Sequence, residues 1–152
     1  MNMESKFQNR HSGGNRYMKS QKPIKSFSEL GENIRKQYFN DNFPELLNMS
    51  KTNDLNSILS AIEKFVSEEG KSLSTSQLRN IYDKAKKATG ENELKLIRPN
   101  LAYIAGRSSN AEKGLLAFID LLIKEVNTDI KVKEFHTFFE SVVAYHKFYG
   151  KQ

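Results

Sequence analysis

Apolar residues recur every three or four positions from about residue 28 to the C-terminus of this chain. A period near 3.6 residues is typical of amphipathic helices, whereas a half-buried strand alternates every second residue. No segment alternates in that way, and no longer repeat is present. The sequence therefore predicts an all-α fold, a small helical bundle of five to six helices. Its clearest stripe consists of Leu55, Ile58, Leu59, Ile62, Phe65 and Val66.

Capping residues predict the ends of the first two helices. Ser28 is the expected N-cap of a helix that runs to about Phe39, before Pro44 interrupts the chain. The helix with the stripe above ends at Gly70, which we expect to be its C′ glycine.

The start of the third helix carries the most complete signal. Ser74 and Gln77 have the spacing of a capping box, and Leu73 is placed to pack on Leu78 as a hydrophobic staple. Gly90 is the residue expected to close this helix.

The segment "LKLIRPNLAYIAGR", residues 94–107, combines apolar residues with two arginines. Pro99 suits the first turn of a helix but cannot continue one. We therefore expect a short turn through Glu93–Ile97, a break at Arg98 and a helix from Pro99 to about Arg107. Because a buried unpaired arginine is costly, we expect both guanidinium groups to leave the core at the edges of this segment.

Two longer helices are predicted after this segment. The first opens with a capping box of Ser109 and Glu112, and the second ends at Gly150. The first has an apolar face wider than one partner helix needs, so it lies at the centre of the bundle or takes part in an interface. This face consists of Leu115, Leu116, Phe118, Ile119, Leu122, Ile123 and Val126.

Basic charge is concentrated in two parts of the chain, whose formal net charge is +6. Residues 1–27 carry +5 and residues 79–107 carry +4, whereas the remainder is acidic or balanced. Residues 1–27 also contain few aliphatic side chains, so they cannot bury enough surface to offset their loss of entropy. We therefore expect a basic, flexible N-terminal tail over residues 1–27 and a helical bundle domain over residues 28–152.

The sequence offers no constellation typical of an enzyme. It contains no cysteine, phosphate-binding glycine loop or nucleophile elbow, and His136 and His146 lack the neighbours of a metal site. His146 lies on an apolar stripe and is expected to be a core or interface residue. We expect no catalytic activity, no cofactor and no metal. Without a signal peptide or a membrane-spanning run, the expected location is the cytoplasm.

The basic residues of the third helix and of segment 94–107 predict a surface that follows a nucleic-acid backbone. Arginine binds phosphate oxygens in pairs, and lysine acts as a point charge. The opposing interpretation is an ordinary solvated face, in which Arg79 pairs with Asp83 four residues later. Tyr103 and Tyr145 offer stacking planes, whereas Tyr82 is expected to pack. The candidate RNA-binding residues are Arg79, Lys86, Lys87, Arg98 and Arg107, with Lys84 and Lys95 as further candidates.

Three stretches resemble a known family. "LSTSQLRNIYDKAKK", "LIRPNLAYIAGR" and "FFESVVAYHKFYG" occur in this order and are similar to the small subunit of the type III-A CRISPR effector, the Csm complex. The resemblance covers roughly residues 72–107 and 134–150, while residues 1–50 match nothing. On this resemblance, Arg79 of "TSQLR", Arg98 of "LIRPN" and Arg107 of "YIAGR" fall on basic positions of the family.

The resemblance implies a non-catalytic helical bundle that takes part in antiviral defence. Several copies would stack along the channel in which guide RNA pairs with single-stranded target RNA. The other partners would be the backbone ribonuclease subunit and the large polymerase-like subunit. Because base pairing reads the sequence in RNA-guided effectors, a uniformly basic channel is sufficient.

Two other functions fit the sequence. The segment "EEGKSLSTSQLRNIYDKAKK" resembles a helix-turn-helix, which would make the protein a regulator that binds duplex DNA. Alternatively, the basic tail binds the nucleic acid and the bundle is only an adaptor.

Overall fold

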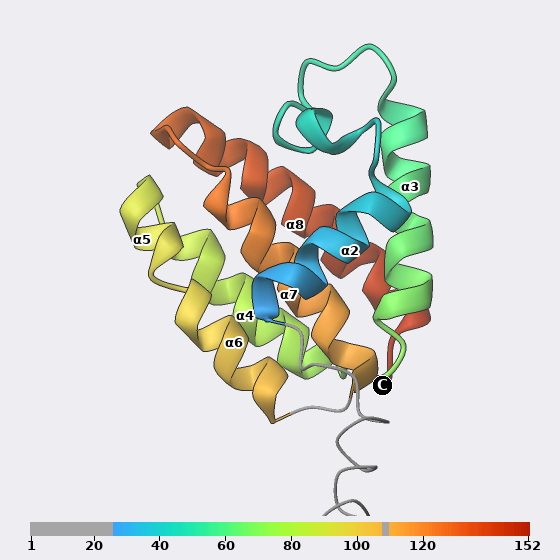
Figure 1. The fold of residues 1–152 in the computed structure, drawn as a ribbon. Coiled ribbons are helices and arrows are strands. Elements are labelled where there is room, and N and C mark those ends of the chain that lie inside the picture. The colour runs from blue at the N-terminus through green and yellow to red at the C-terminus, as the bar shows by residue number, and fades with distance from the viewer. Residues whose placement is uncertain (1–25, 108–109) are drawn as a thin grey trace, which may run out of the picture.

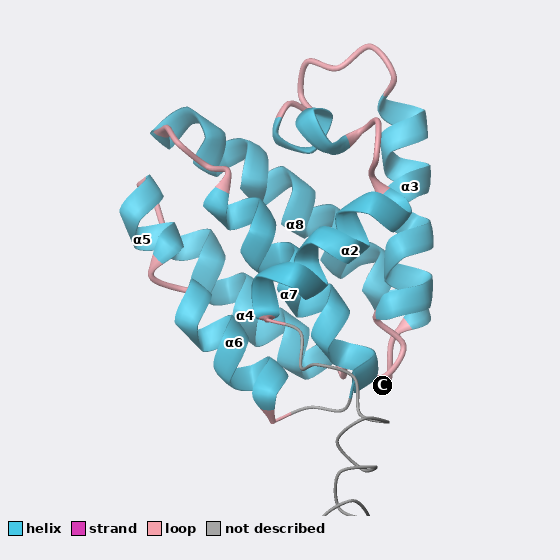
Figure 2. Ribbon diagram, in the orientation of Figure 1, coloured by secondary structure: helices cyan, strands magenta, loops and turns pink. Residues whose placement is uncertain are grey.

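The computed structural model describes residues 26–107 and 110–152, and every regular element within these ranges is helical (Figures 1 and 2). An isolated bridge between Ser74 and Lys151 is the nearest approach to β-structure there. The prediction of an all-α bundle is therefore confirmed. The predicted tail lies almost entirely outside the described residues. The elements are α2 (Phe27–Tyr38), the 3₁₀ helix η1 (Phe43–Leu47), α3 (Leu55–Glu69), α4 (Thr75–Lys87), α5 (Glu91–Lys95), α6 (Arg98–Gly106), α7 (Asn110–Lys124) and α8 (Asp129–Tyr149).

Helices α7 and α8 form the centre of the bundle (Figure 1). Helices α2 and α6 pack on α7, whereas α3 and α4 pack on α8. The wide apolar face predicted for α7 is almost entirely shielded from solvent by these neighbours. Of the two positions that the sequence allowed for this face, the structure therefore shows the central one.

Aromatic rings fill the space around α7. Phe118 stacks on Phe39 at 4.7 Å between ring centroids, and Phe65 and Phe138 approach it edge-on at 5.3 and 6.1 Å. Such offset and edge-to-face pairs contribute beyond their buried area. This cluster ties the end of α2 to α3, α7 and α8.

Several helix ends differ from the sequence expectation. Helix α2 begins one residue before Ser28, and its cap is Ser26, whose side chain accepts a hydrogen bond from the Glu29 backbone in a capping box. Gly70 caps α3 with a negative φ of −109°, so it is not a left-handed C′ glycine. Gly90 precedes α5 as its N-cap instead of closing α4, which ends at Lys87.

The segment expected as a short turn before Arg98 contains the helix α5. Arg98 itself is the first residue of α6, so the break falls one residue earlier than expected. The predicted box of Ser74 and Gln77 is present at α4, with both reciprocal hydrogen bonds. Ser109 of the predicted box with Glu112 lies outside the described residues.

Candidate nucleic-acid interface

Helix α4 packs one face against the core, and its basic side chains lie on the solvent-exposed part of its surface. Leu78, Ile81 and Ala85 are buried, whereas the side chains of Arg79, Lys84, Lys86 and Lys87 are exposed. No ion pair joins Arg79 to Asp83, or to any other residue that the structure describes. The surface pairing considered from the sequence is thus absent, and the Arg79 guanidinium remains available to a ligand.

Lys86 lies over the ring of Tyr82, with 5.6 Å between its ammonium nitrogen and the ring centroid. The same ring meets Phe139 of α8 edge-on at 5.4 Å, so Tyr82 packs against the core as expected. The Tyr82 hydroxyl, and after it Glu140, raises the pKa of Lys86. Lys86 therefore keeps its positive charge at an exposed position on α4.

Arg107 stands at the end of α6 beside an exposed tyrosine. Its guanidinium lies 5.5 Å from the Tyr103 ring centroid, and Nη1 donates a hydrogen bond of 3.3 Å to the Tyr103 hydroxyl. Tyr103 is 63% exposed, so both side chains face solvent. The pair presents a cation and an aromatic plane together, a combination that suits single-stranded nucleic acid.

Arg98 has a different environment from the other candidates. Its Nε donates to Oδ1 of Asp120 at 2.8 Å, and one Nη donates to Oδ2 at 3.4 Å. The Asp120 side chain is only 5% exposed and that of Arg98 is 34% exposed. The expectation that Arg98 leaves the core is therefore only half right, because its charge is neutralised by a buried carboxylate of α7.

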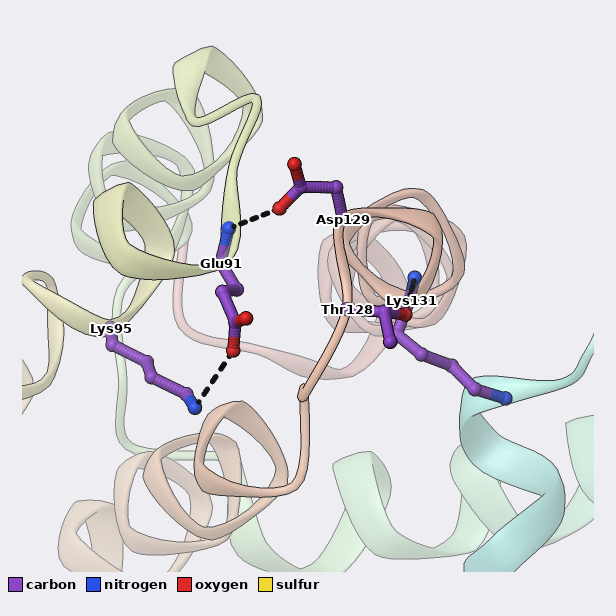
Figure 3. A network of polar contacts seen from close by, with 5 residues as sticks. All are labelled: Glu91, Lys95, Thr128, Asp129 and Lys131. Carbon is purple, nitrogen blue, oxygen red and sulfur yellow. Dashed lines mark hydrogen bonds and ion pairs between the residues drawn. The ribbon is translucent and has the colours of Figure 1, made fainter.

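Lys95 is also paired (Figure 3). Its Nζ lies 3.2 Å from Oε2 of Glu91, one turn earlier on α5. The backbone N–H of Glu91 in turn donates to Asp129 at the start of α8, at 3.0 Å. This network holds α5 against α8. Because Glu91 already neutralises Lys95, this lysine is a weaker candidate for binding phosphate than the lysines of α4, which form no ion pair with a described residue.

A hollow of about 110 Å³ lies where the start of α4 meets the end of α8. We call it the Arg79 hollow; Thr75, Ser76, Arg79, His146 and Lys147 line it. Lys147 is a candidate that the sequence interpretation missed. The available signal was its position directly after His146, since a residue that follows a buried one on a helix falls on a different face.

The two histidines in the described part of the chain serve the fold. His146 is 1% exposed, its Nε2 lies 2.9 Å from the Gly70 carbonyl oxygen, and burial lowers its pKa. It is thus a satisfied core residue, as expected. His136 Nε2 lies 2.8 Å from the carbonyl oxygen of Ala85. Within the described residues, no cluster of histidine and acidic side chains could hold a metal ion.

The five candidates therefore form two groups on separate helices. Arg79, Lys86 and Lys87 follow α4, which packs on α8. Arg98 and Arg107 lie at opposite ends of α6, which packs on α7. The α4 group extends into the Arg79 hollow, where Lys147 adds a cation that forms no ion pair with a described residue.

Comparison with known families decides the class of protein. The family model Csm2 Type III-A matches residues 49–152 of the chain. The chain belongs to this family. It is thus a small subunit of the type III-A CRISPR effector, the Csm complex, and the resemblance seen in the sequence is confirmed. No curated protein and no solved structure matches the chain.

The Csm2 match contains both candidate groups and the Arg79 hollow, but not residues 1–48. Helix α2 and η1 therefore lie outside the matched part, although α2 covers one side of α7. None of the helices in the described part of the chain is long and apolar enough to cross a membrane.

Proposed function

We propose that this Csm2 subunit has no catalytic role and contacts the sugar-phosphate backbones of guide RNA and single-stranded target RNA in the Csm complex. The observation that carries the proposal is the row of exposed cations on α4, at Arg79, Lys86 and Lys87, none of which forms an ion pair with a carboxylate of the described residues. Arg107 at the end of α6 adds a fourth exposed cation, which forms no ion pair with a described residue.

The chemistry of the Arg79 hollow suits a phosphate group. A guanidinium and an ammonium from two different helices, Arg79 and Lys147, line it together with the hydroxyls of Thr75 and Ser76. Charge-assisted hydrogen bonds to phosphate are short and strong, and hydroxyl groups add neutral donors. Such contacts hold the strand without reading its bases.

The proposed partners are the backbone ribonuclease subunit, the large polymerase-like subunit and further copies of Csm2 itself. Support for stacking between copies comes from the two ends of α8, where Ile130 is 75% exposed and Phe148 is 81% exposed. Helix α8 has 21 residues and is therefore about 30 Å long. An end-to-end contact between these two surfaces would place successive copies along the RNA.

The decisive experiment compares two triple variants in a reconstituted Csm complex. Arg79→Ala, Lys86→Ala and Lys87→Ala remove the α4 cations, whereas Lys51→Ala, Lys64→Ala and Lys124→Ala remove the same charge from exposed positions elsewhere. We expect the α4 variant to bind target RNA more weakly and with a log–log salt slope shallower by about 2, since each phosphate contact on a single strand contributes about 0.7. Equal slopes for the two variants would refute the proposal.

The two alternative functions predict different results. A helix-turn-helix regulator would bind duplex DNA more tightly than RNA. Helices α3 and α4 each pack mainly on α8, and family membership favours the Csm subunit. If the tail were the binding element, deletion of residues 1–26 would abolish RNA retention and the α4 variant would retain it.

A further inference from the structure

A second hollow, of about 370 Å³, opens between the start of α2, helix α6 and helix α7. This size falls within the range of small-molecule sites. We call it the Arg98 hollow. Its polar groups are those of Ser28, Lys95, Arg98 and Asp120, and Phe27 and Pro99 supply apolar walls.

The Arg98 hollow has no excess of positive charge. The Asp120 carboxylate neutralises Arg98, and Glu91 neutralises Lys95. A phosphate placed there would meet two cations whose charges are already compensated, so it would gain far less than beside the free cations of α4. The hollow is therefore better suited to an uncharged polar ligand.

Arg98 offers such a ligand a fixed pair of donors. A guanidinium carries five N–H donors in a rigid planar fork. Asp120 engages Nε and one Nη side-on. One N–H group of each Nη atom points away from Asp120. These two groups are parallel, and no described residue accepts a hydrogen bond from them. Because Asp120 is buried on α7, it holds the plane of this fork in one orientation.

We propose that the Arg98 hollow binds one unpaired base of an RNA strand, with a preference for guanine. Two parallel N–H donors match the adjacent O6 and N7 acceptors of guanine, a pairing that arginine makes with this base in nucleic-acid complexes. Adenine places an amino donor beside its N7 and cannot accept both hydrogen bonds. The Phe27 ring gives the base an aromatic surface to pack against.

This proposal rests on the proposed function, because the α4 cations bring the strand to the subunit. It adds a base-dependent contact to a surface that otherwise ignores sequence. Asp120 acts in it as a positioning residue, since it orients Arg98 and is almost inaccessible to the ligand.

The test uses the full-length protein and fluorescence anisotropy with ten-nucleotide RNAs of uridine that differ at one central position. This position is guanosine, adenosine or an abasic ribose. We expect the guanosine RNA to bind about tenfold more tightly than the abasic RNA, which is within the discrimination of one bidentate base contact. The adenosine RNA should lie between them.

Two variants separate the hollow from general RNA affinity. Ala102→Phe fills the Arg98 hollow from an exposed position on α6, and Arg98→Lys keeps the charge but removes the fork. Both should lose the preference for guanosine and bind the abasic RNA within about twofold of the unaltered protein. Ala144→Phe, at an exposed position on α8, is the matched control and should keep the preference.

The outcomes distinguish this inference from the function on which it rests. Equal affinity for the guanosine and abasic RNAs, or a preference that survives Ala102→Phe, overturns the base site and leaves backbone binding intact. Absence of salt-dependent binding to every RNA overturns the proposed function, and the base site with it.

Discussion

Gly31 of α2 lies directly against the backbone of Ala117 in α7. A Cβ atom at position 31 would stand 2.6 Å from the Ala117 carbonyl oxygen and 3.2 Å from the Cβ of Leu121. The first of these neighbours is helix backbone and cannot rotate away. The close approach of α2, which lies outside the part matched by the Csm2 family, thus depends on this glycine.

We expect Gly31→Ala to lower the free energy of unfolding by about 1–3 kcal/mol, the usual cost of overpacking a core. Urea denaturation monitored by circular dichroism would measure it. The matched control is Gly106→Ala at the end of α6, where a Cβ would have no described neighbour within 4 Å and φ is not positive. That change should raise stability by about 0.4–1 kcal/mol, because alanine has less freedom to lose. A Gly31→Ala protein as stable as the original would show that α2 can move off α7 freely.

The ion pair of Arg98 and Asp120 should behave as a unit. Arg98→Ala leaves the Asp120 carboxylate buried and unpaired, and we expect a loss of about 2 kcal/mol, less than for a fully buried pair because the Arg98 side chain is partly exposed. The double variant Arg98→Met and Asp120→Leu replaces the pair by apolar side chains and should be more stable than Arg98→Ala alone. Urea titrations of Arg98→Met, Asp120→Leu and the double variant that combines them would give the coupling energy. Purely additive losses would contradict the pairing.

The fold was predictable from the sequence where local signals acted alone. The capping box of Ser74 and Gln77, and the stripes of α3 and α8, require only neighbours a few residues away. The cap of α2 shows where the partner decides. Ser26 has Glu29 three residues later and completes the capping box, whereas the residue three positions after Ser28 is Gly31, which has no side chain to return the hydrogen bond.

The basic residues of the candidate site could be predicted from the sequence, but their arrangement in space could not. Exposure of Arg79, Lys86 and Lys87 followed from the apolar stripe on α4. The ion pair of Arg98 did not follow from the sequence. Its partner Asp120 is 22 residues away and lies within an apolar run that gives no sign of a charge pair. Lys147 reaches the Arg79 hollow only because α8 ends beside the start of α4, which is a tertiary relationship.

His146 should make the stability of the protein depend on pH. Burial lowers its pKa in the folded chain, whereas the unfolded chain titrates near the ordinary value of 6.5. Below about pH 6.5 the unfolded chain binds a proton that the folded chain does not. The free energy of unfolding therefore falls as the pH decreases from 6.5 towards the folded pKa, by at most about 1.4 kcal/mol per pH unit from this group.

The measurement compares the original protein with His146→Gln, which keeps a donor for the Gly70 carbonyl, in urea titrations at pH 7.5 and pH 5.5. The free energy of unfolding of the original protein minus that of His146→Gln should be smaller at pH 5.5 than at pH 7.5. Since all carboxylates are common to both proteins, the difference isolates His146. An advantage that is constant or grows towards low pH would mean that the histidine is not held neutral.

The exposed ends of α8 allow a test of end-to-end stacking. Phe148→Asp and Ile130→Asp each place a charge on one end only, and both positions are solvent-exposed, so each subunit should keep its stability within about 0.5 kcal/mol. Each variant alone should form Csm complexes with fewer Csm2 copies, because every contact between copies needs one end of each kind. Native mass spectrometry of reconstituted complexes would count the copies. Leu55→Asp, at an exposed leucine on α3, is the control and should leave the number unchanged.

A mixture of the two variants sharpens this test. The intact Phe148 end of the Ile130→Asp protein can meet the intact Ile130 end of the Phe148→Asp protein. Each pair of molecules can form only one such contact, because the two remaining ends of the pair both carry aspartate. An equimolar mixture should therefore yield pairs but no longer rows. If both variants alone, and their mixture, gave the unaltered number of copies, the ends of α8 would not be the stacking surfaces.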